Sequence, residues 1–423
     1  MNKRFRRVSR LFRKLIGVLN MPVDNPAPPL ARGQSFDVLL SVWNVFHSRE
    51  QRQAFIRNGL SVHWVGNHYP PMKGAVTKRS FAWIPCTVFV WAIYWKMQSF
   101  GIHASMWLFN LYSGSRRLNA KIVWAYVEFN PWLLKRAKRR RIPIVLDCPI
   151  AHMDDYYALK PEFEACGVRW PDWWIRRWVE VAKREYALAD WFNVGSSFVK
   201  DSLVKRGVSP DRIFVIPYGI DADRWRKCHD RRDPQAPLAF VYTASIDPRK
   251  GIQYLMRAWK KAKLDHAELW ICGGTESSMD WNRVCGGPPP HVRFFGRVNH
   301  DRLVELYSKA SVYVLPSLLE GLARTGLEAM AAGLPVIVTK ETGLTDFVSD
   351  GVEGWIVPSR DARALAERFN WCATHPNAIR AAGSAAFRRM EGQDFAAYGD
   401  QCATIAQKII EGETPPLHFP STR

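Results

Sequence analysis

Residues 312–338 read VYVLPSLLEGLARTGLEAMAAGLPVIV, and the pattern of this stretch decides the fold class. Short apolar runs at 312–316 and 335–338 are typical of buried strands, and the segment between them has the length and composition of a helix. A helix that joins two neighbouring strands makes them parallel. The stretch therefore predicts a βαβ unit in an α/β protein with a doubly wound, parallel sheet.

The ends of the expected helix are also marked. Thr325 and Glu328 have the spacing of a capping box, which predicts a helix start near Thr325, while Gly333 and Pro335 predict its end. Glu320 then lies in the loop at the carboxyl end of the first strand, and Glu328 lies in the first helical turn. Free backbone N–H groups at such a position favour an anionic ligand.

Taken alone, Glu328 is equally well explained as a cap without a ligand, and Glu320 as an exposed loop acid. Their separation of eight positions, in this context, resembles the E-x7-E signature of the family 4 retaining glycosyltransferases of the GT-B type. The resemblance implies two Rossmann-like, doubly wound domains that face each other across a cleft. It also implies that Glu320 contacts the hydroxyl groups of the donor sugar, with Gly321 and Leu322 beside it, and that Glu328 holds the ribose of the nucleotide.

Length and cysteine usage limit the classes of protein. The chain of 423 residues is long enough for two domains, and with 47% hydrophobic residues it can bury a core. Its eight cysteines form no CxxC pair and no Cys/His cluster, which argues against a structural zinc site and against a disulfide framework. A reducing cytoplasm is therefore the expected location.

Positive charge is concentrated in the first half of the chain. The formal net charge is +21, and residues 1–215 hold 34 Lys and Arg against 15 Asp and Glu, whereas residues 216–423 hold 26 against 24. Such asymmetry predicts an anionic partner for the first half and a different ligand for the second.

Residues 1–20 place apolar and basic side chains on different faces of a helix, which predicts a basic amphipathic helix in a membrane interface. A calmodulin-like or nucleic-acid-binding arm and an organelle transit peptide have similar composition. Residues 21–34, with four prolines, are the expected linker. The apolar run 81–95 is shorter than the roughly 20 residues that a bilayer requires, so we expect no transmembrane helix. Any membrane contact would then be peripheral, at the inner face.

Two further segments of the first half suit an anionic surface. Residues 135–141 contain six cations in seven positions, and residues 169–178 place four tryptophans among three arginines. A solvated helix end and a single-stranded nucleic-acid site are alternative interpretations of these two segments. We expect an anionic membrane surface, with no nucleic acid as partner.

The first domain is expected over residues 35–215, as the acceptor side, because strand and helix patterns alternate there as in a parallel sheet. The family's glycine pair after the first strand is absent, since the loop at 43–48 reads WNVFHS. His152 follows a later strand end. The resemblance places such a histidine near the donor sugar, which makes His152 a candidate catalytic residue.

The second domain is expected over residues 216–394, with the tail 395–423 packing back on the first domain. Arg249 and Lys250 precede a glycine at a helix start, where two cations and free N–H groups suit a diphosphate. This loop is therefore the predicted phosphate site of the donor.

One phosphate cation of the family is missing. Ala244-Ser245 stands where family members usually carry Gly-Arg, so Arg249 or Arg324 is the expected substitute. The resemblance also places Arg297 and Val298, at the end of another strand, close to the nucleotide base.

Asp221 and Asp223 have the D-x-D spacing by which another class of glycosyltransferases binds a divalent metal. Two acids one position apart are frequent by chance, and this pair falls in the expected turn between the domains. We therefore predict no metal site.

The expected function is a retaining, metal-independent transfer of a sugar from a nucleotide donor such as a UDP- or GDP-sugar, without a cofactor. Glu320, His152 and Lys250 are the predicted catalytic residues. The basic first half predicts a lipid-linked or membrane-proximal glycan acceptor, such as a polysaccharide or a glycolipid. Two alternatives stay open: a non-catalytic basic protein that binds nucleic acid or membrane, and a phosphorylase of GT-B shape, which would need a cofactor lysine and a longer chain.

Overall fold

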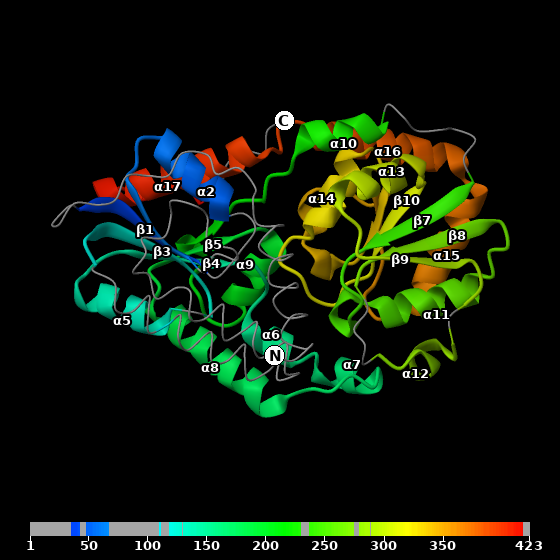
Figure 1. The fold of residues 1–423 in the computed structure, drawn as a ribbon, viewed down its shortest axis with the longest axis horizontal. Helices are drawn as coiled ribbons and strands as arrows, with labels where there is room; N and C mark the ends of the chain where they lie inside the picture. Colours follow the sequence, from blue (N-terminus) through cyan, green and yellow to red (C-terminus); the bar gives the residue numbers. More distant parts are fainter. Residues whose placement is uncertain are drawn as a thin grey trace, which may run out of the picture.

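The computed structural model consists of two parallel, six-stranded sheets, each covered by helices (Figure 1). It describes residues 35–42, 48–66, 110, 118–128, 130–229, 237–274, 279–287 and 289–417. The predicted basic helix, the linker, the apolar run 81–95 and most of the loop at 43–48 lie outside these residues. The predicted doubly wound α/β class is confirmed.

The first sheet has the strand order β2-β1-β3-β4-β5-β6. Its strands are β1 (Phe36–Val42), β2 (Val62–Gly66), β3 (Ala120–Tyr126), β4 (Ile144–Cys148), β5 (Trp191–Val194) and β6 (Ile213–Val215). Its helices are α2 (Ser48–Arg57), α5 (Pro131–Arg139), α6 (Met153–Tyr157), α7 (Lys160–Ala165), α8 (Asp172–Leu188) and α9 (Ser197–Val204). Consecutive residues of β1 and β4 are buried, because helices cover both faces of a parallel sheet.

The second sheet has the order β9-β8-β7-β10-β11-β12, and a strand-order reversal lies between β7 and β10. Its strands are β7 (Leu238–Thr243), β8 (Ala267–Cys272), β9 (Val292–Gly296), β10 (Val312–Leu315), β11 (Val336–Val338) and β12 (Gly354–Ile356). Its helices are α10 (Ala222–His229), α11 (Ile252–Ala262), α12 (Trp281–Cys285), α13 (His300–Lys309), α14 (Arg324–Ala331), α15 (Ala362–Thr374) and α16 (Pro376–Arg389). Ligands of such sheets bind outside the carboxyl ends of the two strands at the reversal.

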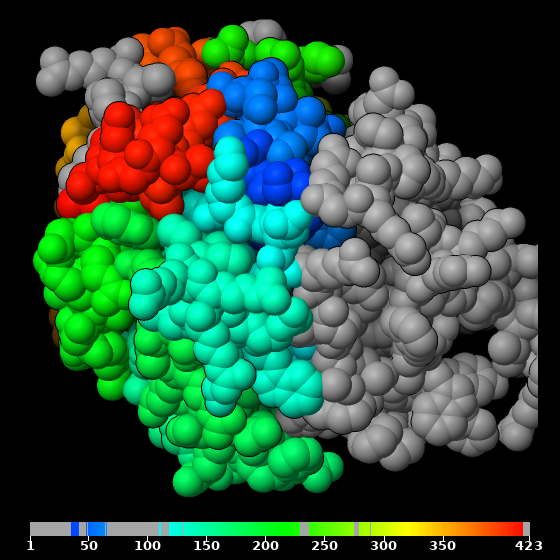
Figure 2. Space-filling model, turned by 90° about the vertical axis from the view of Figure 1, so that its left-hand side faces the viewer, coloured from blue at the N-terminus to red at the C-terminus, as the bar shows by residue number. Residues whose placement is uncertain are grey.

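The last helix, α17 (Phe395–Glu411), returns to the first domain and lies beside α2 (Figures 1 and 2). Arg57 pairs with Asp400 at 2.7 Å across this contact. The chain therefore passes between the domains twice. At the two passages, Ile220 N donates to Gln393 O at 3.2 Å.

Among the described residues, none of the helices combines the length and the apolar character that crossing a bilayer requires.

The double passage between the domains requires a glycine. A Cβ at Gly219 would overlap the backbone carbonyl of Asp394. We expect Gly219→Ala to lower the free energy of unfolding by roughly 1–3 kcal/mol, because the two passages must separate to admit the methyl group. Thermal unfolding measures the effect. Gly59→Ala is the comparison: nothing lies within 4 Å of a Cβ there, and only its left-handed backbone (φ 81°) is strained. Unfolding of Gly219→Ala at the wild-type temperature would contradict the prediction.

Candidate active site

The carboxyl ends of β7 and β10 bring two loops together. The strands pair directly, with Phe240 opposite Val312, so the loop 244–251 after β7 lies beside the loop 316–323 after β10. Gly251 has a left-handed backbone (φ 71°), and a Cβ at this position would overlap the carbonyl oxygen of Pro316. Only glycine allows the two loops to approach this closely.

The Glu320 carboxylate is the centre of this junction. Its Oε1 lies 2.5 Å from Lys250 Nζ and 3.1 Å from Arg249 Nη1, and it accepts a hydrogen bond from Ser317 Oγ at 3.1 Å. The backbones are joined as well, since Leu318 N donates to Arg249 O at 2.7 Å. Three of the sequence-predicted site residues are thus in direct contact. Among the described residues, all three side-chain contacts of Glu320 are made by Oε1. Its other oxygen, Oε2, is therefore the one available to a ligand.

The charges of this group are coupled. Burial acts to raise the pKa of Glu320, which is only 7% exposed, but the positive charges of Arg249 and Lys250 outweigh it and lower that pKa. Burial lowers the pKa of Lys250, although Glu320 opposes the change. The pKa of Arg249 is raised, because Glu320 and Asp247 outweigh burial. With all three ionised, the group carries one surplus positive charge, which suits an anionic ligand.

The loop after β10 also contacts the first domain. Ser196 Oγ donates to Gly321 O at 2.5 Å, and Ala151 N donates to Glu320 O at 3.3 Å. A Cβ at Gly321 would overlap the carbonyl oxygen of Pro149. The loop that carries Glu320 therefore lies at the boundary between the domains, where a substrate of each can meet.

The capping box predicted for α14 is wrong. The helix begins at Arg324, and Ala323 is the residue before it, with no side-chain cap. Thr325 lies inside the helix and its hydroxyl is 2.8 Å from the Tyr313 hydroxyl, while Glu328 pairs with Arg324 Nε at 3.3 Å. A hydroxyl twelve positions earlier in the chain and an arginine one helical turn earlier have taken the place of the cap. The predicted helix end is confirmed, because Gly333 has a left-handed backbone (φ 76°).

Glu328 has a different environment from Glu320. It is 5% exposed, and burial raises its pKa to about 7, with Arg324 and Arg224 acting in the opposite direction. Near neutral pH it therefore exchanges between a carboxylate, which accepts hydrogen bonds only, and an acid, which can also donate.

His152 lies just inside the first domain. Its Nδ1 accepts from Asp154 N at 3.2 Å and so caps α6, and its ring packs 4.6 Å from that of Tyr186. Its backbone N–H donates to Ser202 Oγ at 2.8 Å. Burial lowers its pKa, so the imidazole is neutral at pH 7. The structure places it one residue after Ala151, which contacts the Glu320 backbone, and its catalytic role stays a prediction.

The other predicted donor residues lie around the same strand ends. Leu322 is buried beside Gly195 of the first domain. Arg297 is exposed at the end of β9, with its side chain over Gly274, and Val298 is half-buried against the core. Their contacts to a nucleotide base stay a prediction.

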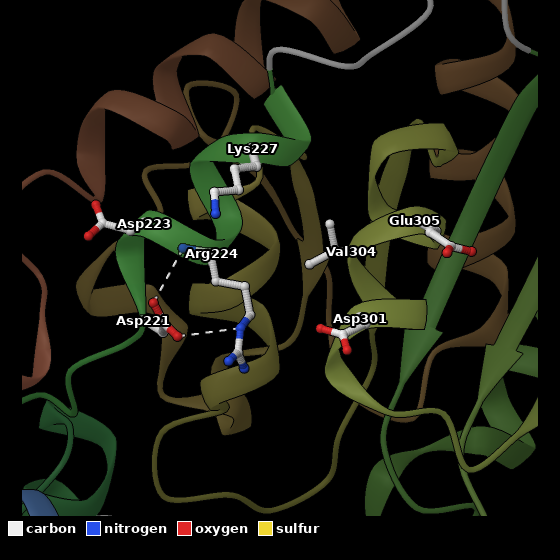
Figure 3. A pocket seen from close by; sticks show the side chains of 7 residues that line it. All are labelled: Asp221, Asp223, Arg224, Lys227, Asp301, Val304 and Glu305. Atoms are coloured by element: carbon white, nitrogen blue, oxygen red, sulfur yellow. Dashed lines mark hydrogen bonds and ion pairs between the residues drawn. The ribbon is translucent and has the colours of Figure 1, made fainter.

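Sequence reasoning missed a cavity between α10 and α13, with a volume of about 510 Å³ (Figure 3). Its lining residues are Asp221, Asp223, Arg224, Lys227, Asp301, Val304 and Glu305. Asp221 accepts from Arg224 N at 3.3 Å and pairs with Arg224 Nε at 3.4 Å, which gives this acid a role in holding an arginine. The three-residue spacing of the two was the available signal. No group of three or more His, Cys, Asp or Glu side chains that could hold a metal is found among the described residues.

A second cavity, of about 470 Å³, opens where the domains meet. It is lined by α6 and α9 of the first domain, by Leu318 and Leu319 directly before Glu320, and by Lys340, Glu341 and Arg360. Its walls therefore combine apolar side chains with charges of both signs, beside the residue expected to hold the donor sugar.

Two family profiles together match most of the described chain: "Glycosyltransferase Family 4" matches residues 46–224, and "Glycosyl transferases group 1" matches residues 237–375. The chain belongs to family 4 of the glycosyltransferases. A curated relative in this family, the MMP alpha-(1->4)-mannosyltransferase of Mycolicibacterium hassiacum, is 26% identical over 59% of this chain and 62% of its own length. The chain spans between 43% and 62% of the lengths of the curated relatives it matches.

Solved structures support the GT-B fold that the family resemblance implied. Sucrose-phosphate synthase from Thermosynechococcus elongatus aligns with a TM-score of 0.63 at 19% identity, over 89% of this chain and 100% of that one. The Anabaena protein HepE in complex with UDP and glucose aligns with a TM-score of 0.54 at 13% identity, over 89% and 100%. At these identities the likeness concerns the fold.

The raised pKa of Glu328 predicts a pH dependence of donor use. If Glu328 binds the ribose of the donor, as the family resemblance implies, its ionised form accepts hydrogen bonds from the two ribose hydroxyls, so kcat/KM for the donor should rise about tenfold as pH increases through about 7. Activity at saturating acceptor between pH 5.5 and 8.5 measures it. Glu328→Gln, which does not titrate, should remove this limb of the profile. The same limb in the Gln variant would show that another group is responsible.

Proposed function

We propose that the protein is a retaining glycosyltransferase that moves a sugar from a nucleoside diphosphate to a glycan acceptor, without a metal ion or another cofactor. The observation that carries this proposal is the contact of Glu320 with Lys250 and Arg249 at the strand-order reversal of the second sheet. The carboxylate that would bind sugar hydroxyls is therefore in contact with the cations that would bind the diphosphate, so one nucleotide-sugar molecule can reach both.

The chemistry follows from the charges. As the bond between the sugar's C1 and the phosphate oxygen breaks, negative charge grows on the diphosphate, and Lys250 with the surplus positive charge of the group stabilises it. Glu320 Oε2 orients the sugar through a hydroxyl. The acceptor oxygen forms its bond to C1 on the face from which the diphosphate leaves, and its proton passes to the leaving phosphate. The family supports this retaining course, and fixed cations supply the charge stabilisation that a metal gives elsewhere.

The acceptor site is proposed for the cavity of about 470 Å³ between the domains. It adjoins Glu320 through Leu318 and Leu319, and its apolar walls suit the faces of a sugar ring, while its charged rim suits hydroxyl groups. Closure of the domains over both substrates would exclude water from the reaction.

The acceptor is proposed to be lipid-linked or membrane-proximal, with the protein on the cytoplasmic side of an anionic membrane. Helices α5 and α8 pack together on one side of the first sheet (Figure 1). Lys135 and Arg139 are exposed there, as are Trp132 and Trp173, the latter at 67%. Of the four tryptophans in residues 169–178, however, Trp173 alone is exposed, since the others pack into the domain.

Nucleotide-sugar binding is the first test of the proposal. UDP-, GDP- and ADP-sugars are screened by thermal shift, and we expect one series to raise the unfolding temperature saturably, since a ligand of the native state stabilises it. Glu320→Gln should keep the fold and lose roughly 10²–10³ in kcat/KM. Glu320→Ala is a poorer choice, because it removes the oxygen that Lys250 and Arg249 contact as well as its charge, whereas Gln keeps an oxygen there. Glu367→Gln, an exposed surface pair with Arg363, is the control. Salt-sensitive nucleic-acid binding without any nucleotide-sugar binding would favour the non-catalytic alternative.

The membrane proposal has a separate test. The full chain should co-sediment with vesicles containing anionic lipid, more than with neutral vesicles, and removal of residues 1–20 should weaken the binding. Lys135→Glu with Arg139→Glu should weaken it further, because each basic residue near the surface contributes about 1 kcal/mol. Lys261→Glu with Lys309→Glu, exposed in the second domain, is the control of equal charge. Equal binding to neutral and anionic vesicles would exclude the anionic surface.

A further inference from the structure

Both predicted substitutes for the cation missing from the loop after β7 have partners within the protein. Arg249 Nη1 contacts Glu320 Oε1 and donates to the carbonyl of Leu319 at 2.9 Å. Its guanidinium therefore links the loop after β7 to the loop after β10. Arg324 pairs with Glu328 on the same helix. A diphosphate held by Lys250 therefore still needs a second cation at its nucleoside end.

Arg224 is the arginine that the fold brings to this end. It lies on α10, the first helix after the passage between the domains, and α10 packs against both α13 and α14, the helix of Glu328. The neighbouring Trp225 is buried and lies 5.4 Å from the ring of Tyr307 on α13, which fixes the rotation of α10. Arg224 extends from α10 along the cavity, with Asp221 at its Nε (Figure 3).

The surroundings of Arg224 support a ligand outside the cavity rather than in it. Four carboxylates line the cavity, and they would repel a phosphate placed inside. Arg224 is 37% exposed and close enough to Glu328 and His300 that its charge lowers the pKa of both. Arg224 and Glu328 thus belong to two helices that pack against each other, α10 and α14.

We propose that Arg224 binds the ribose-proximal phosphate of the donor, and so supplies from the interdomain passage the cation that Ala244-Ser245 lacks. The inference rests on the proposed function. A phosphate on the 5′ carbon of a ribose held by Glu328 lies next to that ribose, and a guanidinium offers it two parallel N–H donors. The ion pair with Asp221 holds the guanidinium of Arg224 in this orientation.

The role has a mechanical consequence. Arg224 follows the passage at 216–221 by three residues, and that passage is hydrogen-bonded to the return passage at Gln393. A donor phosphate held by Arg224 therefore ties the nucleotide to the connection between the domains, whereas Lys250 ties it to the second domain alone.

Binding of a nucleoside series tests the assignment. UDP, UMP and uridine, with the guanosine and adenosine series in parallel, are titrated by calorimetry against the wild type and Arg224→Gln. We expect the variant to bind the diphosphate and the monophosphate roughly 10- to 100-fold more weakly, as for loss of a charge-assisted hydrogen bond, and the nucleoside with unchanged affinity. Arg224→Lys should recover part of the loss. Arg226→Gln, an exposed cation two positions along α10 that does not line the cavity, should bind all three as the wild type does.

Three other outcomes would each contradict a specific part of the inference or of the proposed function. Equal loss for the nucleoside and both nucleotides would show that Arg224 acts on the ribose or on the fold, and would overturn the phosphate assignment. Unchanged diphosphate affinity in Arg224→Gln would overturn the inference and leave the proposed function standing. Absence of binding of all three series to the wild type would overturn both.

Discussion

The buried carboxylate of Glu320, placed between Lys250 and Arg249, is the interaction on which the rest of the site depends. Withdrawing three charged groups from water is costly, and the cost is recovered only when all three are present, since removal of one partner from a buried pair typically costs 3–5 kcal/mol. The two loops must therefore remain in register. This requirement explains Gly251 and Gly321, where any side chain would force a neighbouring backbone away.

The same group couples the two domains. The loop that carries Glu320 is hydrogen-bonded to Ser196 and Ala151 of the first domain through its backbone oxygens, so a movement of the first domain acts on the backbone of this loop. A substrate that displaces Lys250 from Glu320 Oε1 also changes the charge that holds this loop. On the proposed function, donor binding and the relative position of the domains therefore depend on the same contacts of this loop, and no coupling between distant sites is required.

The spacing of apolar residues and the short motifs correctly predicted those features that depend on residues close together in the sequence. The apolar runs at 312–316 and 335–338 predicted two parallel strands, and Gly333 predicted the helix end. The capping box failed because the Thr325 hydroxyl finds Tyr313, a partner that local spacing cannot reveal. The cavity beside α10 was missed for the same reason: the approach of that helix to α13 and α14 is decided by tertiary packing. The three-residue spacing of Asp221 and Arg224 could indicate their pairing, but not the cavity beside it.

The positive charge of the chain is distributed unevenly between its two halves. The second half is nearly neutral overall, with 26 cations against 24 acids, so it cannot attract a nucleotide from a distance. Cations around the proposed donor site are each paired with an acid: Lys250 with Glu320, Arg324 with Glu328, and Arg224 with Asp221. Such pairing balances the positive charges of this region and fixes their positions. The first half has no comparable balance, with 34 cations against 15 acids, and this excess is the sequence feature behind the proposed anionic partner.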